Sequence, residues 1–207
     1  MLPAIVGHRG ARGEAPENTL PSFERAVIAG VSEIELDVRL SRDDELFVLH
    51  DPDLKRTTGH NGNAHNLLLA SALAHDARHA IHGWPTACPI PSLQQVVDSC
   101  PEHMRFQFEV KADGKAPLKR TAERLARMIR EQALEHRVVV TSSSARFLAS
   151  MRHAAPEIHR GYVCQFRRNK PIQTCLDLQC HWLISHYGLV SESLMDHVRR
   201  HDLGISV

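Results

Sequence analysis

Short apolar runs alternate with amphipathic segments along most of this chain of 207 residues. The runs are typical of strands, and the three- and four-residue spacing of the apolar positions between them is typical of helices. We predict strands at residues 4–6, 34–38, 46–49, 106–111, 138–141, 160–164, 182–185 and 205–207. We predict helices at residues 20–29, 93–99, 118–133, 145–153 and 193–201, and a further helix around 67–82. This alternation predicts an α/β fold in which helices cover a parallel sheet.

One connection is too short for a helical crossover. The strands 34–38 and 46–49 flank the turn sequence at 41–44, so we predict that they form a hairpin. An open doubly wound sheet and a closed barrel both fit the other connections, and the lack of a G-x-G-x-x-G turn weakens the dinucleotide-binding version. We find no linker or repeat, and therefore predict one domain over residues 1–207 with an irregular excursion at 51–91.

The composition narrows the function. The chain carries 25 Lys and Arg against 24 Asp and Glu, so it lacks the basic character of a general nucleic-acid binder. Its five cysteines are odd in number and include no C-x-x-C pair, which favours reduced thiols in a cytoplasmic protein. No apolar run approaches the ~20 residues of a membrane helix, and the first residues do not resemble a signal peptide. An oligomer is compatible with this composition.

Acidic and apolar residues alternate in the predicted strand 34–38. Glu35 and Asp37 share one face of this strand, and the residues between and beside them are apolar. Two neighbouring carboxylates on a covered strand would repel each other and lose hydration, and a hard cation such as Mg²⁺ or Ca²⁺ removes both penalties. An edge strand with a solvated acidic face would show the same alternation.

The predicted strand 106–111 repeats this pattern. Gln107, Glu109 and Lys111 share one face, opposite two phenylalanines and a valine. A third carboxylate beside a lysine would complete a site for a metal and an anion, because the ammonium group can meet a phosphate oxygen. A surface strand with a Glu–Lys pair is the simpler interpretation, but the repetition of the pattern weakens it.

Histidines follow two of the predicted strands. His8 and Arg9 come after the first strand, and His50 comes after the second arm of the hairpin. The ends of strands usually build the sites of α/β folds, where histidine suits acid–base chemistry and arginine offers a planar fork to phosphate. A single histidine at such a place is more often structural, but an adjacent histidine–arginine pair is harder to explain in that way.

These segments resemble, in the same order, the motifs of the glycerophosphodiester phosphodiesterase family. The motifs are His8-Arg9-Gly10, Pro16-Glu17-Asn18-Thr19, Glu35-Leu36-Asp37-Val38 and His50-Asp51-Pro52-Asp53-Leu54-Lys55-Arg56-Thr57-Thr58-Gly59. Residues 90–93, 108–111 and 138–143 are similar to later blocks of the family. The resemblance runs from residue 4 to the end of the chain, and the first 60 residues carry most of its specificity.

The resemblance implies a (β/α)8 TIM-type barrel that cleaves a glycerophosphodiester, a small molecule, into sn-glycerol 3-phosphate and an alcohol. It implies a divalent metal, Mg²⁺ or Ca²⁺, as the cofactor. The residues that it assigns are His8 and His50 as general acid and base, Arg9 and Lys111 on the substrate phosphate, Glu35, Asp37 and Glu109 on the metal, and Glu17 as an acid that orients these groups.

The family continues through two more strand–helix units beyond residue 207, so we predict a barrel that lacks its last units in this chain. Two other functions fit the residues. One is a metal-dependent amidohydrolase on a similar barrel, which would need His-x-His where this chain has His8-Arg9-Gly10. The other is a non-catalytic phosphoester-binding or scaffold protein built on an incomplete barrel.

Overall fold

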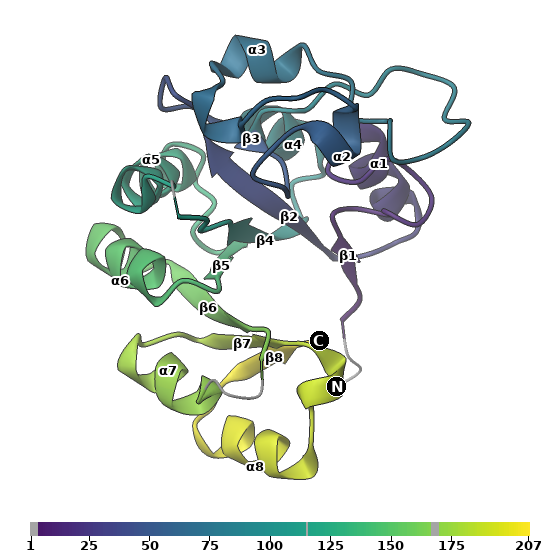
Figure 1. The fold of residues 1–207 in the computed structure, drawn as a ribbon. Helices are drawn as coiled ribbons and strands as arrows, with labels where there is room; N and C mark the ends of the chain where they lie inside the picture. Colours follow the sequence, from purple (N-terminus) through teal and green to yellow (C-terminus); the bar gives the residue numbers. More distant parts are fainter. Residues whose placement is uncertain (1–3, 115, 167–169) are drawn as a thin grey trace. The chain divides into compact units, whose positions relative to one another are not determined.

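The computed structural model describes residues 4–114, 116–166 and 170–207. Residues 1–3, which are part of the segment compared above with a signal peptide, lie outside this description. The chain divides into two compact units, Met1–Pro117 and Leu118–Val207. Each unit contains parallel strands and its own helices (Figure 1).

The sheet of the first unit is built around a hairpin. Its strands are β1 (Val6–His8), β2 (Glu33–Leu40), β3 (Leu46–Val48) and β4 (Arg105–Val110). The parallel strands follow the order β1-β2-β4, and β3 runs antiparallel to β2. This arrangement confirms the predicted hairpin. Because β1, β2 and β4 are parallel, their carboxyl ends lie along one edge of the sheet.

Strand β2 is buried along its whole length. It lies between β1 and β4, so it is not the edge strand that the alternative interpretation of its acidic face required. Ile34, Leu36 and Val38 on one face are completely shielded from solvent. The other face carries charged side chains that are also buried, and they therefore need compensation from neighbouring groups.

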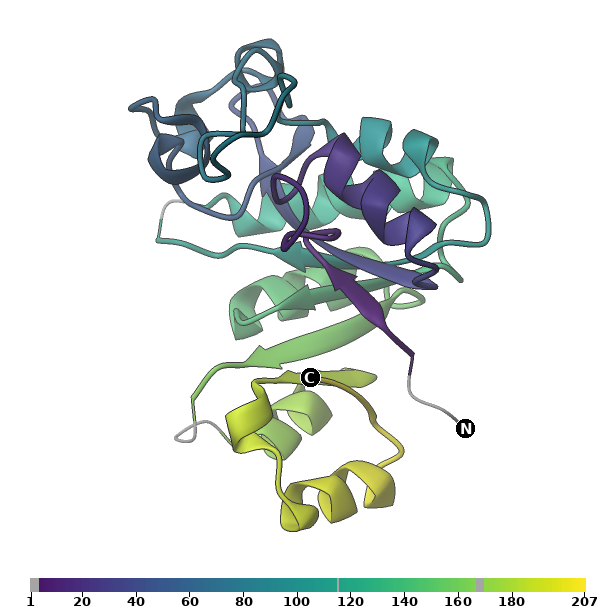
Figure 2. The same cartoon turned by 90° about the vertical axis from the view of Figure 1, so that its right-hand side faces the viewer.

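Two helices of the first unit, α1 (Leu20–Ile28) and α4 (Leu93–Ser99), pack side by side (Figure 2). Pro21 lies in the first turn of α1, where its missing N–H costs nothing. The first turn of α4 is held by a capping box, in which Ser92 and Gln95 satisfy each other's backbone N–H groups. Both helices were predicted from their apolar spacing.

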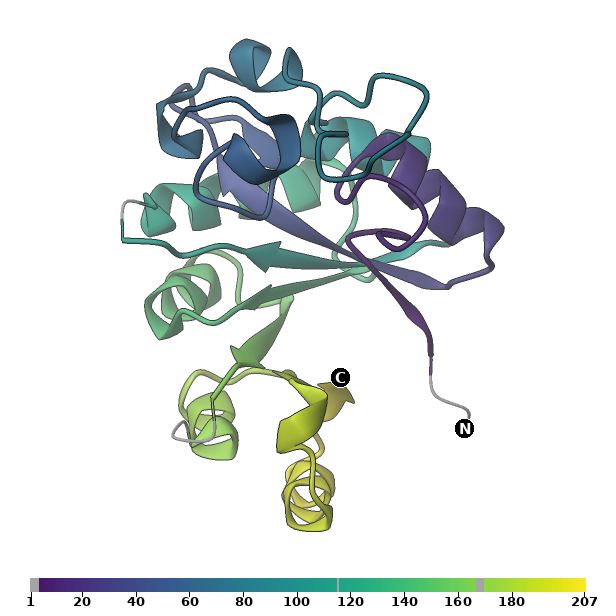
Figure 3. The ribbon, with the colours of Figure 1, turned by 45° about the vertical axis from the view of Figure 1, so that its right-hand side comes forward.

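Between β3 and α4 the chain makes the irregular excursion seen in Figure 3. It holds only short helices, which are α2 (Lys55–Thr58), η1 (Ala64–Asn66) and α3 (Leu69–Leu73). A separate apolar cluster stabilises it, formed by Phe47, Leu49, Leu54, Ala64, Ala72, Ala77 and Ile90. The excursion is therefore packed onto the hairpin arm that leads to His50.

The predicted helix around 67–82 is wrong for most of its length, because α3 ends at Leu73. The carboxylate of Asp76 accepts hydrogen bonds from the backbone N–H groups of Arg78 and Cys88, at 3.1 and 3.0 Å. Such local side-chain bonds offer the backbone an alternative to helical bonds, and here they turn the chain back toward Pro89.

The second unit is a succession of parallel strands and helices. Its strands are β5 (Val138–Ser142), β6 (His159–Cys164), β7 (Trp182–Ser185) and β8 (Gly204–Ser206), paired in chain order. Its helices are α5 (Leu118–Glu131), α6 (Ala145–Ala154), α7 (Pro171–Asp177), η2 (Tyr187–Leu189) and α8 (Glu192–Arg200). Helix α7 was not predicted, although Ile172, Cys175 and Leu176 have a helical spacing, and only Cys175 of this helix is fully buried.

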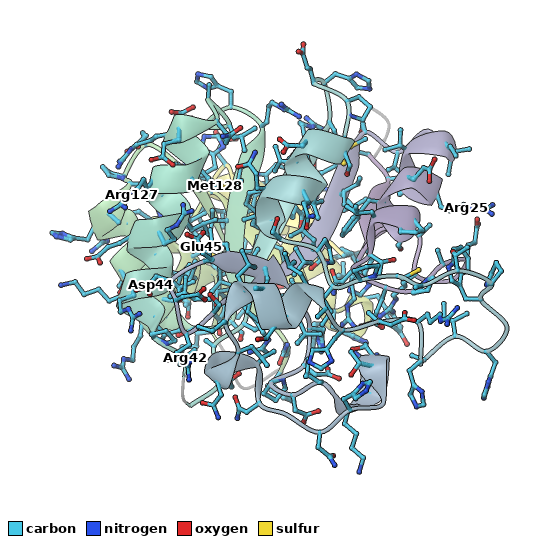
Figure 4. The ribbon with its side chains drawn as sticks, turned by 90° about the horizontal axis from the view of Figure 1, so that it is seen from above. Arg25, Arg42, Asp44, Glu45, Arg127 and Met128 are labelled. Atoms are coloured by element: carbon cyan, nitrogen blue, oxygen red, sulfur yellow. The ribbon has the colours of Figure 1, made fainter. Side chains whose placement is uncertain are left out.

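Helix α5 shows the spacing on which the helix predictions rested. Leu125, Met128 and Ile129 are buried, whereas Arg127 is exposed. Arg127 and Met128 are labelled in Figure 4. This is the pattern of a helix with one covered face. No described helix is long and apolar enough to cross a membrane.

Strand β1 begins two residues later than predicted. Ile5 lies within the predicted strand but is 73% exposed, and the strand covers Val6–His8 instead of residues 4–6. His8 is therefore the last residue of the strand and pairs with Glu35 in the register of β1 and β2. The shift brings the side chain of His8 toward the acidic face of β2.

Candidate active site

Three carboxylates converge at the centre of the first unit. Glu35 and Asp37 lie on β2, and Glu109 lies on β4 directly opposite Asp37 in the parallel register. One oxygen atom from each of the three lies within 4.8 Å of the others. Glu35 is 7% exposed and Asp37 is fully buried. The alternation on two neighbouring strands thus produces one acidic cluster.

The charges of this cluster are only partly compensated. The ammonium group of Lys111 lies 2.6 Å from Glu109 Oε1 and 2.9 Å from Asp37 Oδ1. Burial alone would raise the pKa of Asp37, but Lys111 and Arg9 hold it below its ordinary value. Burial, together with the charges of Asp37 and Glu109, raises the pKa of Glu35 well above its ordinary value.

Glu35 also carries a buried oxygen, Oε1, that has no hydrogen-bond partner among the described residues. Three close carboxylates, one with an unpaired buried oxygen, form a donor set that fits a hard divalent cation such as Mg²⁺ or Ca²⁺. The acidic cluster is therefore a candidate metal centre.

His8 lies beside the cluster, with Nε2 3.8 Å from Glu35 Oε2. Burial and then the charges of Arg12 and Arg9 lower the pKa of His8 to about 4. The imidazole of His8 is therefore neutral at physiological pH, with a nitrogen lone pair available as a proton acceptor.

Arg9 is held against the cluster by a tight turn. Its backbone N–H donates to Glu35 Oε2 at 3.0 Å, and its guanidinium Nε lies 3.2 Å from Asp37 Oδ2. Arg9 and Gly10 have φ angles of 55° and 76°, in the left-handed region. A Cβ atom at position 10 would lie 2.6 Å from Ser22, so the turn requires glycine there.

Asn18 orients the most buried carboxylate. Its side-chain amide donates to Asp37 Oδ2 at 2.7 Å, and its amide oxygen accepts from the backbone N–H of Asp37 at 3.3 Å. The pair of bonds fixes Asp37 against rotation. No role was predicted for Asn18, although it lies inside the segment 16–19 that carries the family resemblance.

A chain of ion pairs connects Arg9 with His50. Glu17 accepts from Arg9 at 2.9 Å and from Arg56 at 2.7 and 2.9 Å. Arg56 also donates to Asp51 at 2.6 and 3.2 Å, and Asp51 Oδ1 lies 2.6 Å from His50 Nδ1. Glu17 thus bridges Arg9, in the turn after β1, and Arg56, on α2. Asp51 and Arg56 had no predicted role.

The surroundings of Asp51 favour its ionised carboxylate form beside His50. Burial would raise the pKa of Asp51, but hydrogen bonds from Arg56 and His50 keep it below its ordinary value. An ionised Asp51 favours a proton on His50 Nδ1, which leaves Nε2 as the nitrogen that can exchange protons with a ligand. The charge of His50 also acts on Asp37, so the imidazole lies within electrostatic reach of the acidic cluster.

The structure places all eight residues selected from the sequence in the first unit. Seven of them are joined by the contacts above into one network, and the eighth, His8, lies beside Glu35. Parallel strands that alternate with helices and carry this acidic cluster define an α/β protein with a candidate metal centre. The chain belongs to the glycerophosphoryl diester phosphodiesterase family, whose model matches residues 8–207.

Individual proteins support this assignment. A glycerophosphodiester phosphodiesterase of Bacillus altitudinis is 33% identical over 157 residues, which are 74% of this chain and 63% of that protein. One from Caldanaerobacter subterraneus subsp. tengcongensis is 28% identical over 197 residues, 95% of this chain and 81% of its own length. The chain thus spans less than two thirds of the first relative.

A solved structure shows the same fold. It is an Oleispira antarctica phosphodiesterase in complex with the product sn-glycerol-3-phosphate, 26% identical, with a TM-score of 0.87 over 99% of this chain and 83% of that chain. This similarity confirms the barrel fold predicted from the sequence.

Proposed function

We propose that the protein hydrolyses glycerophosphodiesters to sn-glycerol 3-phosphate and an alcohol, with a divalent cation and two histidines. The proposal rests above all on the convergence of Glu35, Asp37 and Glu109 beside His8 and Arg9. The family supports the reaction class, and the product complex of the Oleispira phosphodiesterase supports a glycerophosphate product.

The proposed reaction requires the site to compensate the negative charge of the phosphodiester. A phosphodiester is an anion, and negative charge on its oxygens grows as the new bond forms. Glu35, Asp37 and Glu109 would hold Mg²⁺ or Ca²⁺, and the bound ion would supply part of the charge stabilisation. Arg9 has a planar guanidinium group that suits phosphate, and Lys111 adds a second positive charge at 2.6 Å from Glu109.

The two histidines have different environments, which supports different roles. His8 is neutral because its pKa is lowered to about 4, so we assign it the role of general base toward the attacking hydroxyl or water. The Nδ1 atom of His50 lies 2.6 Å from Asp51 Oδ1, a contact that orients the imidazole, so we assign His50 the role of general acid toward the leaving alkoxide.

The amidohydrolase alternative meets a steric objection at position 10. A His-x-His motif would need a histidine where Gly10 lies, and any side chain there would come within 2.6 Å of Ser22 while adopting a left-handed φ. A purely binding role is less well supported, because every acidic, basic and imidazole side chain that the proposed reaction uses is present in the site. The described cysteines are all free thiols, which supports the cytoplasmic location proposed from the sequence.

The direct test is an assay for release of sn-glycerol 3-phosphate from glycerophosphocholine. We expect turnover with Mg²⁺ or Ca²⁺, loss of turnover with excess EDTA, and recovery when the cation is restored. We expect His50→Ala to lower kcat by about 10² or more while circular dichroism stays unchanged. The matched control is His136→Ala, because His136 is exposed and lies in the second unit. Folded wild-type protein that releases no product with either cation would refute the proposal.

A further inference from the structure

A buried arginine holds the backbone at the position where His50 enters the site. Arg39 lies on β2, two residues beyond Asp37 and on the same face, and it is 3% exposed. Its Nε donates to the carbonyl of Leu49 at 3.0 Å, and one terminal nitrogen donates to the carbonyl of His50 at 2.7 Å. The guanidinium fork therefore binds two consecutive peptide groups.

The remaining nitrogen of the guanidinium group binds a carboxylate from another segment of the first unit. The other terminal nitrogen of Arg39 donates to Asp113 Oδ2 at 2.6 Å, and Asp113 follows shortly after β4. The second oxygen of Asp113 contacts Nε2 of His65 at 2.5 Å. Burial would raise the pKa of Asp113, but Arg39 and then His65 lower it. Asp113 is therefore a carboxylate that neutralises the buried guanidinium.

Beyond the last backbone hydrogen bond between β2 and the chain after β3, the side chain of Arg39 provides the hydrogen bonds that hold that chain. Strand β3 ends at Val48, and the N–H of Leu49 donates to the carbonyl of Asp37 at 2.9 Å. Beyond that bond, the carbonyls of Leu49 and His50 accept from the side chain of Arg39. The backbone of His50 is thus tied to the strand that carries Glu35 and Asp37.

We propose that Arg39 is a positioning residue for His50. A guanidinium with three nitrogens engaged in one plane fixes the distance and the direction of the peptide that it holds. This inference rests on the proposed function, because it takes His50 as a proton-transfer group. A misplacement of about 1 Å at such a group costs on the order of 10²-fold in rate, so a residue that prevents it acts on kcat.

The test is Arg39→Lys. An ammonium group keeps the charge opposite Asp113 but lacks the planar fork that reaches both carbonyls and the carboxylate together. We expect kcat to fall roughly 10- to 100-fold, with KM changed less than about 3-fold. The calorimetric affinity for Mg²⁺ or Ca²⁺ should stay close to that of the wild type, because Glu35 and Asp37 keep their own contacts.

A double-mutant cycle separates positioning from general loosening of the fold. In a His50→Ala background, Arg39→Lys should produce little further loss of kcat, because the group that it positions is already absent. The matched control is Arg160→Lys. Arg160 is 2% exposed and also donates to backbone carbonyls, those of Ile158 and Gln179 among them, but it lies in the second unit. This control should lose stability and keep kcat.

A second variant keeps the inference testable if Arg39→Lys does not fold. Asp113→Asn leaves the fork on its two carbonyls but removes its anionic anchor, and we expect a smaller loss of kcat that again disappears in the His50→Ala background. Losses that add fully in both cycles, or an unchanged kcat in a folded Arg39→Lys protein, would overturn the inference. An inactive wild type, or an active His50→Ala variant, would refute the proposed function instead.

Discussion

Replacement of Lys111 by methionine tests the electrostatic description of the acidic cluster. Lys111 has a side chain that is 16% exposed, and its ammonium group makes two short contacts, to the fully buried Asp37 at 2.9 Å and to Glu109 at 2.6 Å. Removal of one partner from a buried ion pair typically costs about 3–5 kcal/mol, because the remaining charges are left uncompensated. For a chain of this length, such a loss lowers Tm by roughly 6–20 °C.

A divalent cation should reverse much of this loss. We expect urea unfolding of Lys111→Met in excess EDTA to show the full deficit near neutral pH, and saturating Mg²⁺ or Ca²⁺ to reduce it strongly. A ligand at 100 times its Kd stabilises the folded state by about 2.7 kcal/mol, and the variant should gain more than the wild type, because no ammonium group competes for the carboxylates. The deficit should also shrink in mild acid. Burial and the neighbouring carboxylates raise the pKa of Glu35, and the charge of Lys111 opposes this rise. Without Lys111 the pKa is raised further, so protonation of Glu35 as the pH falls favours folding of the variant more than folding of the wild type.

The matched control is Lys119→Met. Lys119 is 80% exposed and lies 3.9 Å from Glu123, so its loss should cost less than about 0.5 kcal/mol with or without cation. The electrostatic description would be refuted by a Lys111→Met protein as stable as the wild type in EDTA. It would also be refuted if cations stabilised the variant no more than the wild type.

Three further outcomes follow from individual contacts. Glu35→Gln should weaken Mg²⁺ or Ca²⁺ binding in calorimetry by at least about 10-fold, and unaltered binding would remove Glu35 from the metal centre. Asp51→Asn should lower kcat by about 10² or more, whereas Asp53→Asn, at an exposed neighbouring acid, should leave kcat unchanged. His8 has its pKa lowered from 6.5 to about 4, so the unfolded state binds its proton first and stability falls as the pH drops through this interval. His8→Asn should flatten that part of the stability profile, and an unchanged slope would contradict the lowered pKa.

Period-two alternation on two strands was enough to select the three carboxylates from the sequence, but not to show that they meet. Glu35 and Asp37 were placed on one face by alternation alone, and Glu109 by the same pattern on β4. Their convergence could not be derived, because it depends on the register of two strands that are far apart in the sequence. The family resemblance supplied that link, and the parallel pairing of Asp37 with Glu109 accounts for it physically.

Hydrogen bonds of polar side chains explain why other features could not be predicted. Asp76 diverted the chain from the helix expected after Leu73, although the residues there have acceptable helix propensities. Arg56 lies five residues beyond Asp51 and reaches back to it and to Glu17, a contact that no periodicity predicts. The side of β2 on which Arg39 lies could have been predicted from the sequence, because Arg39 continues the alternation that begins with Glu35. Its role could not, because its partner Asp113 is distant in the sequence and is identified only by the fold.

The balance of charge in the network gives an independent reason for a divalent ion. Its carboxyl groups are those of Glu17, Glu35, Asp37, Asp51 and Glu109, and its permanently cationic groups are those of Arg9, Arg56 and Lys111. Five potential negative charges thus face three permanently positive ones, and His8 stays neutral because its pKa is about 4. The excess negative charge is felt most at the buried acids, where Glu35 has a raised pKa and an unpaired oxygen. A proton on His50 would offset only one of these charges, at the far end of the network beside Asp51, whereas a divalent cation held by Glu35, Asp37 and Glu109 would offset the charge where it is buried.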